Sequence, residues 1–344
     1  EILSQKTLLA DGAMGTMLHA RGVSFAKCFD ELNLTNPAAV ADIHREYIEA
    51  GAQLIITNTF GANQFKLGKR GLQDRLTEIN RAGVELARRA IAASYKNDVL
   101  VAGDVGPLGV RIAPYGRVKP EEARAAFAEQ IKALADAGVD LIVIETMSDL
   151  YEIQEAIKAA KSVVGADGHL PLPVIASVTF TRDDRTLLGD DPTKVARKLK
   201  EAGADVIGVN CSGGPSQLLR ILKQMKQAVP DGRFWVKPNA GWPEQVGGRI
   251  MYPADADYFG DYALSFREAG ANIVGGCCGT TPQHIAAMKK AFESAPAFVV
   301  DSTAISFEDE ITDEPAEQPT QLAQKLAAGK FSICVEMEPP RGLS

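Results

Sequence analysis

Residues 120–146 read PEEARAAFAEQIKALADAGVDLIVIET, and this stretch decides the fold class. Residues 120–137 have the spacing of apolar side chains that is typical of an amphipathic helix. Gly138 then suits the left-handed conformation that closes a helix. The run LIVIET at 141–146 is a short apolar segment of the kind found in strands that are buried on both faces. A helix followed directly by such a strand indicates a parallel sheet covered by helices.

The same alternation extends to about residue 295. Helices are also expected at 38–50 and 282–293, and further Ala-Gly pairs precede predicted strands at Gly51, Gly203 and Gly270. The predicted strands cover residues 7–11, 53–58, 99–104, 141–146, 173–179, 206–210, 234–239 and 272–276. Eight strand–helix units predict a (β/α)8 TIM barrel in the α/β class. The alternative is a doubly wound open sheet, which usually has fewer units.

Charge and composition divide the chain further. The chain has 344 residues and a net charge of −7, and residues 297–320 hold seven acidic residues with no Lys or Arg. We therefore predict a barrel at 1–296, an acidic linker at 297–320 and the start of a second, truncated domain at 321–344. The acidic balance argues against nucleic-acid binding. No apolar run reaches the ~18 residues of a membrane span and no signal peptide is visible, so a cytoplasmic protein is expected.

Polar residues follow almost every predicted strand. Active sites of (β/α)8 barrels lie at the C-terminal ends of the strands. The alternative is that Asn and Asp merely begin turns there. That alternative explains Glu145 poorly, because this carboxylate ends an apolar run. The residues at these ends are Asp11, Asn58, Asp104, Glu145, Thr179, Asn210, Cys211, Asn239, Cys277 and Cys278.

Three of the five cysteines follow strands that lie near one another in a barrel. Cys211 follows the sixth strand, and Cys277 and Cys278 follow the eighth. Three thiolates with one open position make a catalytic rather than a structural zinc site. Such a site carries a net charge of −1, which favours alkylation of a bound thiolate over hydrolysis. The alternatives are three buried free thiols, or a disulfide between the two adjacent cysteines. Cys28 and Cys334 are expected to have no such role.

The loop DGAMGT at 11–16 follows the first strand. Its two glycines allow backbone N–H groups to face a carboxylate. Glu145 is suited to a substrate ammonium. The alternatives are an ordinary glycine-rich loop and a buried ion pair between Glu145 and a barrel Lys or Arg.

Seven motifs in order resemble zinc-dependent homocysteine S-methyltransferases. They are DGAMGT (11–16), TNTFGAN (57–63), GDVGPLG (103–109), IETM (144–147), VNCSGGP (209–215), KPNAG (237–241) and GGCCGTTPQHI (275–285). The resemblance implies zinc on Cys211, Cys277 and Cys278, and transfer of a methyl group to homocysteine to give methionine. It also implies that homocysteine is held by Glu145 and by the loop that contains Asp11, Ala13, Gly15 and Thr16.

Four further residues complete the predicted site. We place Asn58, Asp104 and Asn210 among the substrate-binding residues, and Asn239 as a displaceable fourth zinc ligand. The methyl donor is left open between methyltetrahydrofolate, methylcobalamin and a sulfonium. Betaine-dependent members have a tyrosine after the glutamate, whereas Thr146 and Met147 follow Glu145, so betaine is not expected.

The C-terminal run FSICVEMEPPRG at 331–342 resembles the first strand of methylenetetrahydrofolate reductases. The resemblance implies a proton-donor role for Glu336 and a bifunctional protein, with FAD and NAD(P)H bound by the missing reductase domain. The alternative is a terminal strand with a turn. An alternative for the whole chain is a homocysteine-binding or regulatory domain, with the main activity in the reductase.

Overall fold

The computed structural model describes residues 3, 6–96, 98–163, 172–246 and 249–294, together with residues 325, 328 and 329. The chain divides into two compact units, Glu1–Val300 and Asp301–Ser344. The linker predicted at 297–320 lies outside the described residues, as does most of the segment 321–344 with Glu336. The predicted domain boundaries therefore stay predictions.

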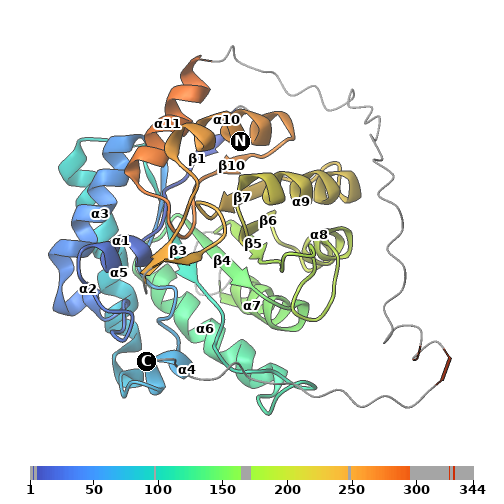
Figure 1. The fold of residues 1–344 in the computed structure, drawn as a ribbon. Helices are drawn as coiled ribbons and strands as arrows, with labels where there is room; N and C mark the ends of the chain where they lie inside the picture. The colour runs from blue at the N-terminus through green and yellow to red at the C-terminus, as the bar shows by residue number, and fades with distance from the viewer. Residues whose placement is uncertain are drawn as a thin grey trace, which may run out of the picture. The chain divides into compact units, whose positions relative to one another are not determined.

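Eight parallel strands form one sheet that closes into a barrel (Figure 1). The order in the sheet is β1-β10-β7-β6-β5-β4-β3-β2, and a parallel bridge between Ala10 and Leu54 joins its two edges. The (β/α)8 prediction is confirmed, and the open-sheet alternative is wrong because the edges pair. The strands are β1 (Leu8–Leu9), β2 (Leu54–Ile56), β3 (Leu100–Val105), β4 (Leu141–Met147), β5 (Val174–Val178), β6 (Val206–Cys211), β7 (Phe234–Pro238) and β10 (Ile273–Val274).

The helices surround the barrel. Several of them begin with a proline, and several end at one of the predicted cap glycines. Prolines occupy the first turn of α3, α6, α8 and α9, where no intrahelical N–H bond is lost. The four predicted cap glycines all have φ between 87° and 112°. The helices are α1 (Gly15–Ala20), α2 (Leu32–Thr35), α3 (Pro37–Ala50), α4 (Gln64–Gly68), α5 (Leu76–Ser94), α6 (Pro120–Asp136), α7 (Leu150–Val163), α8 (Pro192–Glu201), α9 (Pro215–Ala228), α10 (Ala256–Glu268) and α11 (Pro282–Ser294), with a short 3-10 turn at Gln73–Arg75.

The barrel interior decides which side chains reach the site. One apolar cluster takes side chains from all eight strands: Leu8, Ala10, Leu54, Ile56, Ala102, Leu141, Val143, Ile175, Val206, Trp235 and Ile273. Side chains two positions apart on a strand share a face. Asp104, Glu145 and Lys237 each follow an interior residue by two positions, so they lie one layer further toward the C-terminal ends of the strands. The apolar layer thus forms the floor of a polar pocket.

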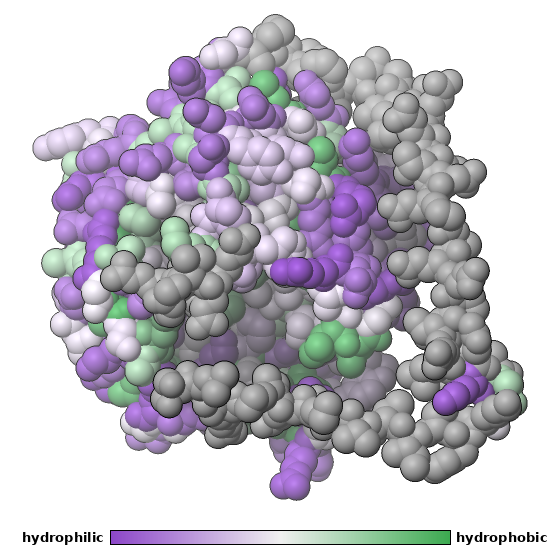
Figure 2. Space-filling view, in the orientation of Figure 1, coloured by the Kyte–Doolittle hydropathy of each residue, from purple (hydrophilic) through white to green (hydrophobic). Residues whose placement is uncertain are grey.

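One pair of strands outside the barrel was not predicted. The connection between β7 and α10 contains an antiparallel pair, β8 (Glu244–Val246) and β9 (Arg249–Met251). On the face seen in Figure 2 the described residues are mostly hydrophilic, with apolar residues in separate patches. In the part of the chain that the structure describes, no helix combines the length and the apolar character that a membrane crossing requires.

Candidate active site

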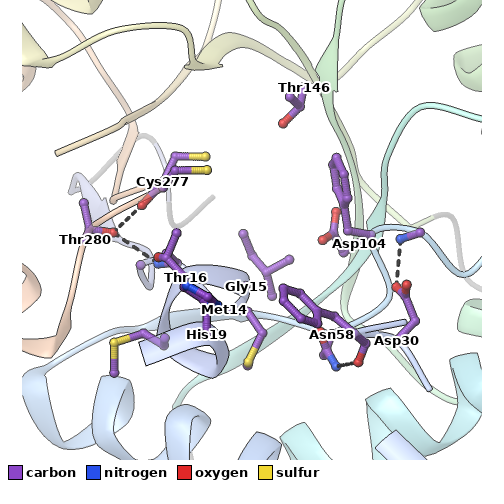
Figure 3. A pocket seen from close by; sticks show the side chains of 18 of the residues that line it. Met14, Gly15, Thr16, His19, Asp30, Asn58, Asp104, Thr146, Cys277 and Thr280 are labelled. Atoms are coloured by element: carbon purple, nitrogen blue, oxygen red, sulfur yellow. Dashed lines mark hydrogen bonds between the residues drawn. The ribbon is translucent and has the colours of Figure 1, made fainter. Parts of the chain in front are cut away.

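A cavity of about 1350 Å³ opens at the C-terminal ends of the strands. Figure 3 shows Cys277 and Thr280 on one side of it, Asp104 and Asp30 on the other, and the residues of α1 between them. Residues in or just after the C-terminal ends of seven of the eight strands reach this cavity, which is the expected place for an active site in this architecture. The cavity extends outward from the cysteines to α4 and to the connection between α1 and α2.

The three predicted cysteines lie together. The sulfur atoms of Cys211, Cys277 and Cys278 are all within 4.8 Å of one another. All three are free thiols in the structure, so the two adjacent cysteines form no disulfide. Three sulfur donors at this spacing form a candidate metal site.

Unusual backbone conformations at the cysteines orient their sulfur atoms toward one another. Cys211 and Ser212 both have a left-handed conformation, with φ of 58° and 54°. This conformation is rare for residues other than glycine, and it clusters at functional sites. After Cys278 the chain turns at Gly279, where φ is 80° and a Cβ atom would overlap the ring of Tyr252. These turns let cysteines from two separate strands converge, as the glycines of GGCCGT predict.

Hydrogen bonds and burial raise the pKa values of the three cysteines. A hydrogen bond from Cys277 lowers the pKa of Cys211, but a hydrogen bond to Cys278 and burial outweigh it and raise that pKa to about 12. The pKa of Cys277 is also raised, by its hydrogen bond with Cys211 and by burial. Three thiolates so close together need a compensating positive charge.

Two more side chains contact the sulfurs. The hydroxyl of Tyr252 lies close enough to Cys278, and the Asn239 amide close enough to Cys211, to lower the pKa of the neighbouring thiol. The Asn239 amide nitrogen also donates to the Ser212 carbonyl at 3.0 Å. Its side-chain oxygen is buried and has no hydrogen-bond partner among the described residues.

Three buried carboxylates share one buried cation. Lys237 forms an ion pair of 2.8 Å with Asp11, and both side chains are less than 5% exposed. Burial lowers the pKa of Lys237, but the charges of Asp11 and Glu145 outweigh it and keep the ammonium protonated. Burial also raises the pKa of Glu145, and burial together with the charge of Glu145 raises that of Asp104. The part of the cavity around Lys237 therefore has more carboxylates than cations and is suited to a substrate ammonium.

The partner of Lys237 bears on the alternative that Glu145 forms a buried ion pair with a barrel Lys or Arg. Among the described residues, Lys237 forms its salt bridge with Asp11. Glu145 is not in a salt bridge with Lys237, but its charge raises the pKa of that lysine. The second oxygen of Asp11 accepts from the backbone N–H of Ile56 at 2.8 Å. Both Asp11 oxygens are thus used within the protein, which favours a supporting role for this residue. The Oδ1 atom of Asp104 has no hydrogen-bond partner among the described residues and is a better placed acceptor.

Asn210 links the carboxylates to the cysteines. Its amide nitrogen donates to Thr146 Oγ1 at 2.7 Å, and lies 3.3 Å from Glu145 Oε2 and 3.9 Å from the sulfur of Cys277. Its oxygen accepts from the Thr146 N–H and from the Ser177 hydroxyl. Asn210 is fully buried, so it positions the residues around it.

The loop at 11–16 is fixed from behind. Thr280 Oγ1 accepts from the Ala13 N–H at 3.1 Å and donates to the Cys277 carbonyl. The Tyr47 hydroxyl donates to the carbonyls of Ala13 and Thr280. The Ala13 N–H therefore has a partner, whereas Gly15 and Thr16 begin α1, where the first N–H groups have no intrahelical acceptor.

Asn58 lies at the rim of the same cavity. Its amide nitrogen donates to the Phe29 carbonyl and to Asn33 Oδ1, which ties β2 to the connection between α1 and α2. Cys28 also lines the cavity but is not part of the cysteine cluster.

Four residues of this site were missed in the sequence: Tyr47, Lys237, Tyr252 and Thr280. Lys237 had a signal, because a lysine interrupts the apolar run FWVKPN at an interior position. Thr280 stands in a quoted motif but without an assigned role. Tyr47 lies on a helix and Tyr252 in a long connection, and no local pattern marks either residue.

Comparisons with known proteins agree on one family. The sequence model of the homocysteine S-methyltransferase family matches residues 8–292. The methionine synthase of Mycobacterium tuberculosis is 33% identical over 296 residues, which are 83% of this chain and 24% of that protein. The methionine synthase of Mycobacterium leprae is 32% identical over 329 residues, which are 92% of this chain and 26% of that protein. The chain thus spans about a quarter of the length of these relatives.

Solved structures give the same result. The crystal structure of the homocysteine methyltransferase MmuM from Escherichia coli in its metallated form superposes with a TM-score of 0.68 and 29% identity. It covers 83% of this chain and 96% of that one. The oxidised form of the same protein gives the same TM-score and identity.

Proposed function

Because the chain belongs to the homocysteine S-methyltransferase family, we propose that it transfers a methyl group to the thiol of homocysteine at a zinc ion and forms methionine. The observation that carries this proposal is the cluster of Cys211, Cys277 and Cys278 beside a pocket rich in carboxylates. One site thereby combines sulfur ligands for a metal with acceptors for an amino acid.

The donor set fits zinc. Three thiolates suit zinc better than the hard cations, which prefer oxygen ligands. Three protein ligands leave a fourth position for the substrate sulfur. Bound zinc would supply a Lewis acid that keeps this sulfur deprotonated at neutral pH.

The amino-acid end of homocysteine fits the pocket beside the cysteines. We place its ammonium against Glu145 and Asp104, where it relieves the repulsion between the two buried carboxylates. Its carboxylate faces the N–H groups of Gly15 and Thr16, and Lys237 balances the remaining charge. Asn58 and Asn210 hold the walls of this pocket.

These contacts orient the homocysteine sulfur for the reaction. Held at its amino-acid end, homocysteine directs its sulfur toward the cysteines and its free lone pair toward the open cavity. That sulfur attacks the methyl carbon of the donor, and the bond from the methyl carbon to the donor breaks with its electron pair left on the donor. The product thioether is a weak ligand and leaves.

The experiment that tests this function is a donor panel. The purified chain with zinc is mixed with homocysteine and, in turn, with methyltetrahydrofolate, methylcobalamin and S-methylmethionine, and methionine is measured. We expect methionine with at least one donor. Homocysteine binding without methionine from any donor would instead identify a homocysteine-binding domain.

The tail supports a proposal of its own. FSICVEMEPPRG suggests a methylenetetrahydrofolate reductase domain with FAD and NAD(P)H in a longer protein, with Glu336 as its proton donor. Replacing Glu336 by Gln in the longer protein should abolish folate reduction and leave the zinc content unchanged. Normal folate reduction by that variant would contradict the role of Glu336, and a longer protein without flavin would contradict the reductase.

A further inference from the structure

We infer that the outer part of the cavity binds the carboxylates of a flat, ring-bearing methyl donor, which is the chemistry of a reduced folate. The inference rests on the proposed function and narrows the choice of donor. The observations that carry it are four cations and three phenylalanines in the wall of the cavity beyond the homocysteine pocket.

The four cations form what we call the basic wall: Lys27, Lys66, Lys69 and Arg70. None of them forms an ion pair with a carboxylate in the described ranges. Lys69 donates to the Gly109 carbonyl at 2.7 Å and Arg70 to the Ala26 carbonyl, contacts that fix the side chains without neutralising them. A ligand with negative charge is the missing partner.

Lys66 is the innermost member of the basic wall. Its ammonium lies 4.4 Å from the ring centroid of Phe60 and has no hydrogen-bond partner among the residues described. Burial lowers the pKa of Lys66, and the charges of Asp30 and Asp104 oppose that shift without cancelling it. A carboxylate placed beside Lys66 would oppose this lowering of its pKa.

The aromatic residues provide faces for a ring. Phe25 is 50% exposed, stacks on His19 at 3.9 Å and lies 5.8 Å from Phe29. Half-exposed phenylalanine in a cavity wall favours an apolar or aromatic ligand that covers it. A small sulfonium has no ring, and its positive charge would face the basic wall.

The charge pattern also orients the donor. Asp104 and Glu145 are carried by the ends of β3 and β4, whereas the basic wall is carried by α4, the residues after it and the connection between α1 and α2. Asp30 lies near Lys66, but the Gly61 N–H satisfies one of its oxygens at 2.8 Å and burial raises its pKa. A donor therefore places its carboxylate tail outward and its ring, with the methyl group, toward the cysteines.

The transfer balances with such a donor. The bond between the homocysteine sulfur and the methyl carbon forms, and the bond between that carbon and the ring nitrogen breaks. The electron pair stays on the nitrogen, which takes a proton from solvent. The size of the cavity is consistent with two ligands, since about 1350 Å³ exceeds what one amino acid fills.

The test measures binding of 5-methyltetrahydrofolate to the zinc-loaded chain with homocysteine, by equilibrium dialysis. The probes carry one or three glutamates. The variant is Lys69→Glu/Arg70→Glu, and Lys66→Met is a second variant that removes a single charge. The matched control is Lys223→Glu/Lys290→Glu, which makes the same charge change at exposed positions on α9 and α11.

We expect the triglutamate to bind several-fold more tightly than the monoglutamate, and the charge reversal to weaken it by roughly tenfold or more. The control should change the Kd less than about twofold, and added salt should weaken binding to the unchanged chain. Absence of folate binding, or equal Kd values for the reversal and the control, would overturn the inference.

Zinc content and homocysteine binding are measured on the same samples. If the unchanged chain binds neither, the proposed function fails. If it binds both but binds methylcobalamin or S-methylmethionine in place of the folate, only the inference about the donor fails.

Discussion

The side-chain amide nitrogen of Asn210 lies 3.3 Å from the carboxylate oxygen Oε2 of Glu145. The same nitrogen is 3.9 Å from the sulfur of Cys277. One buried amide therefore connects the group proposed to bind the substrate ammonium with the group proposed to bind zinc. In the proposed complex, this amide would fix the distance between the groups that bind the two ends of homocysteine.

Replacing Asn210 by Ala should damage both ends of the site. The Thr146 N–H and the Ser177 hydroxyl lose their acceptor, and each buried unpaired group costs about 1–3 kcal/mol. We expect a lower free energy of unfolding in urea and a higher KM for homocysteine. Ser177→Ala is the control, because it removes one partner of Asn210 and leaves the amide contacts to Glu145 and Cys277. Equal KM values in the two variants would show that Asn210 acts on stability alone.

Replacing any one of Cys211, Cys277 and Cys278 by Ser should remove most of the zinc. The unchanged chain is expected to bind about one zinc, and two remaining thiolates are too few for a tight tetrahedral site. Atomic absorption on dialysed protein measures the content. Cys28→Ser is a matched control, since this thiol lines the same cavity outside the cluster. Full zinc occupancy in the triple variant would end the hypothesis of a cysteine site.

Glu145→Gln should weaken homocysteine binding and leave the zinc content intact. The change keeps the shape but removes the charge that faces the ammonium, and a charged hydrogen bond is worth about 1.5–3 kcal/mol. Calorimetry should show a Kd that rises at least tenfold. Glu152→Gln is the control, because this buried carboxylate accepts from the Leu108 N–H and does not line the cavity. An unchanged Kd in Glu145→Gln would mean that the glutamate is structural.

The barrel was predictable because its signals are local. Each strand is a continuous apolar run, and glycines such as Gly51 and Gly138 mark the helix ends in the sequence and adopt the left-handed conformation in the structure. The strands β1 and β10 are shorter than predicted, since their outer residues form loops around the site. The pair β8–β9 was missed because it lies within a connection that has no sustained period.

The site was only partly predictable, because contacts between distant residues leave no local pattern. Strand order alone indicates that Cys211 approaches Cys277, but it does not indicate that Lys237 pairs with Asp11 across 226 positions. The contact between Tyr252 and Cys278 likewise depends on the path of the β7–α10 connection.

The burial of His44 leads to a prediction about how the stability of the barrel depends on pH. It is fully buried on α3, neither ring nitrogen has a partner among the described residues, and burial lowers its pKa from 6.5 to about 4. Between these two values the unfolded chain binds a proton that the folded chain does not, so stability falls as the pH falls through this window. From pH 7 to pH 5 the loss from this residue should be about 2 kcal/mol. Urea unfolding of His44→Leu should show a correspondingly smaller loss, and the same pH dependence in both proteins would contradict the assignment.

Asn239 remains the residue that we predict as the displaceable fourth ligand of the metal. It follows β7, between the strands that carry the cysteines, and its buried side-chain oxygen lacks a partner in the described part of the chain, as expected of a group with a further ligand to meet. Tyr252 is the competitor, since its hydroxyl already contacts Cys278.

Cobalt in place of zinc reports the ligands directly through its visible absorption. Without homocysteine, Asn239→Ala should shift the cobalt bands and Tyr252→Phe should leave them in place. With homocysteine bound, Asn239→Ala and the unchanged chain should give the same spectrum, because the substrate sulfur has taken the fourth position in both. A shift confined to Tyr252→Phe would transfer the role to Tyr252, and identical spectra for all three proteins without homocysteine would leave water as the fourth ligand.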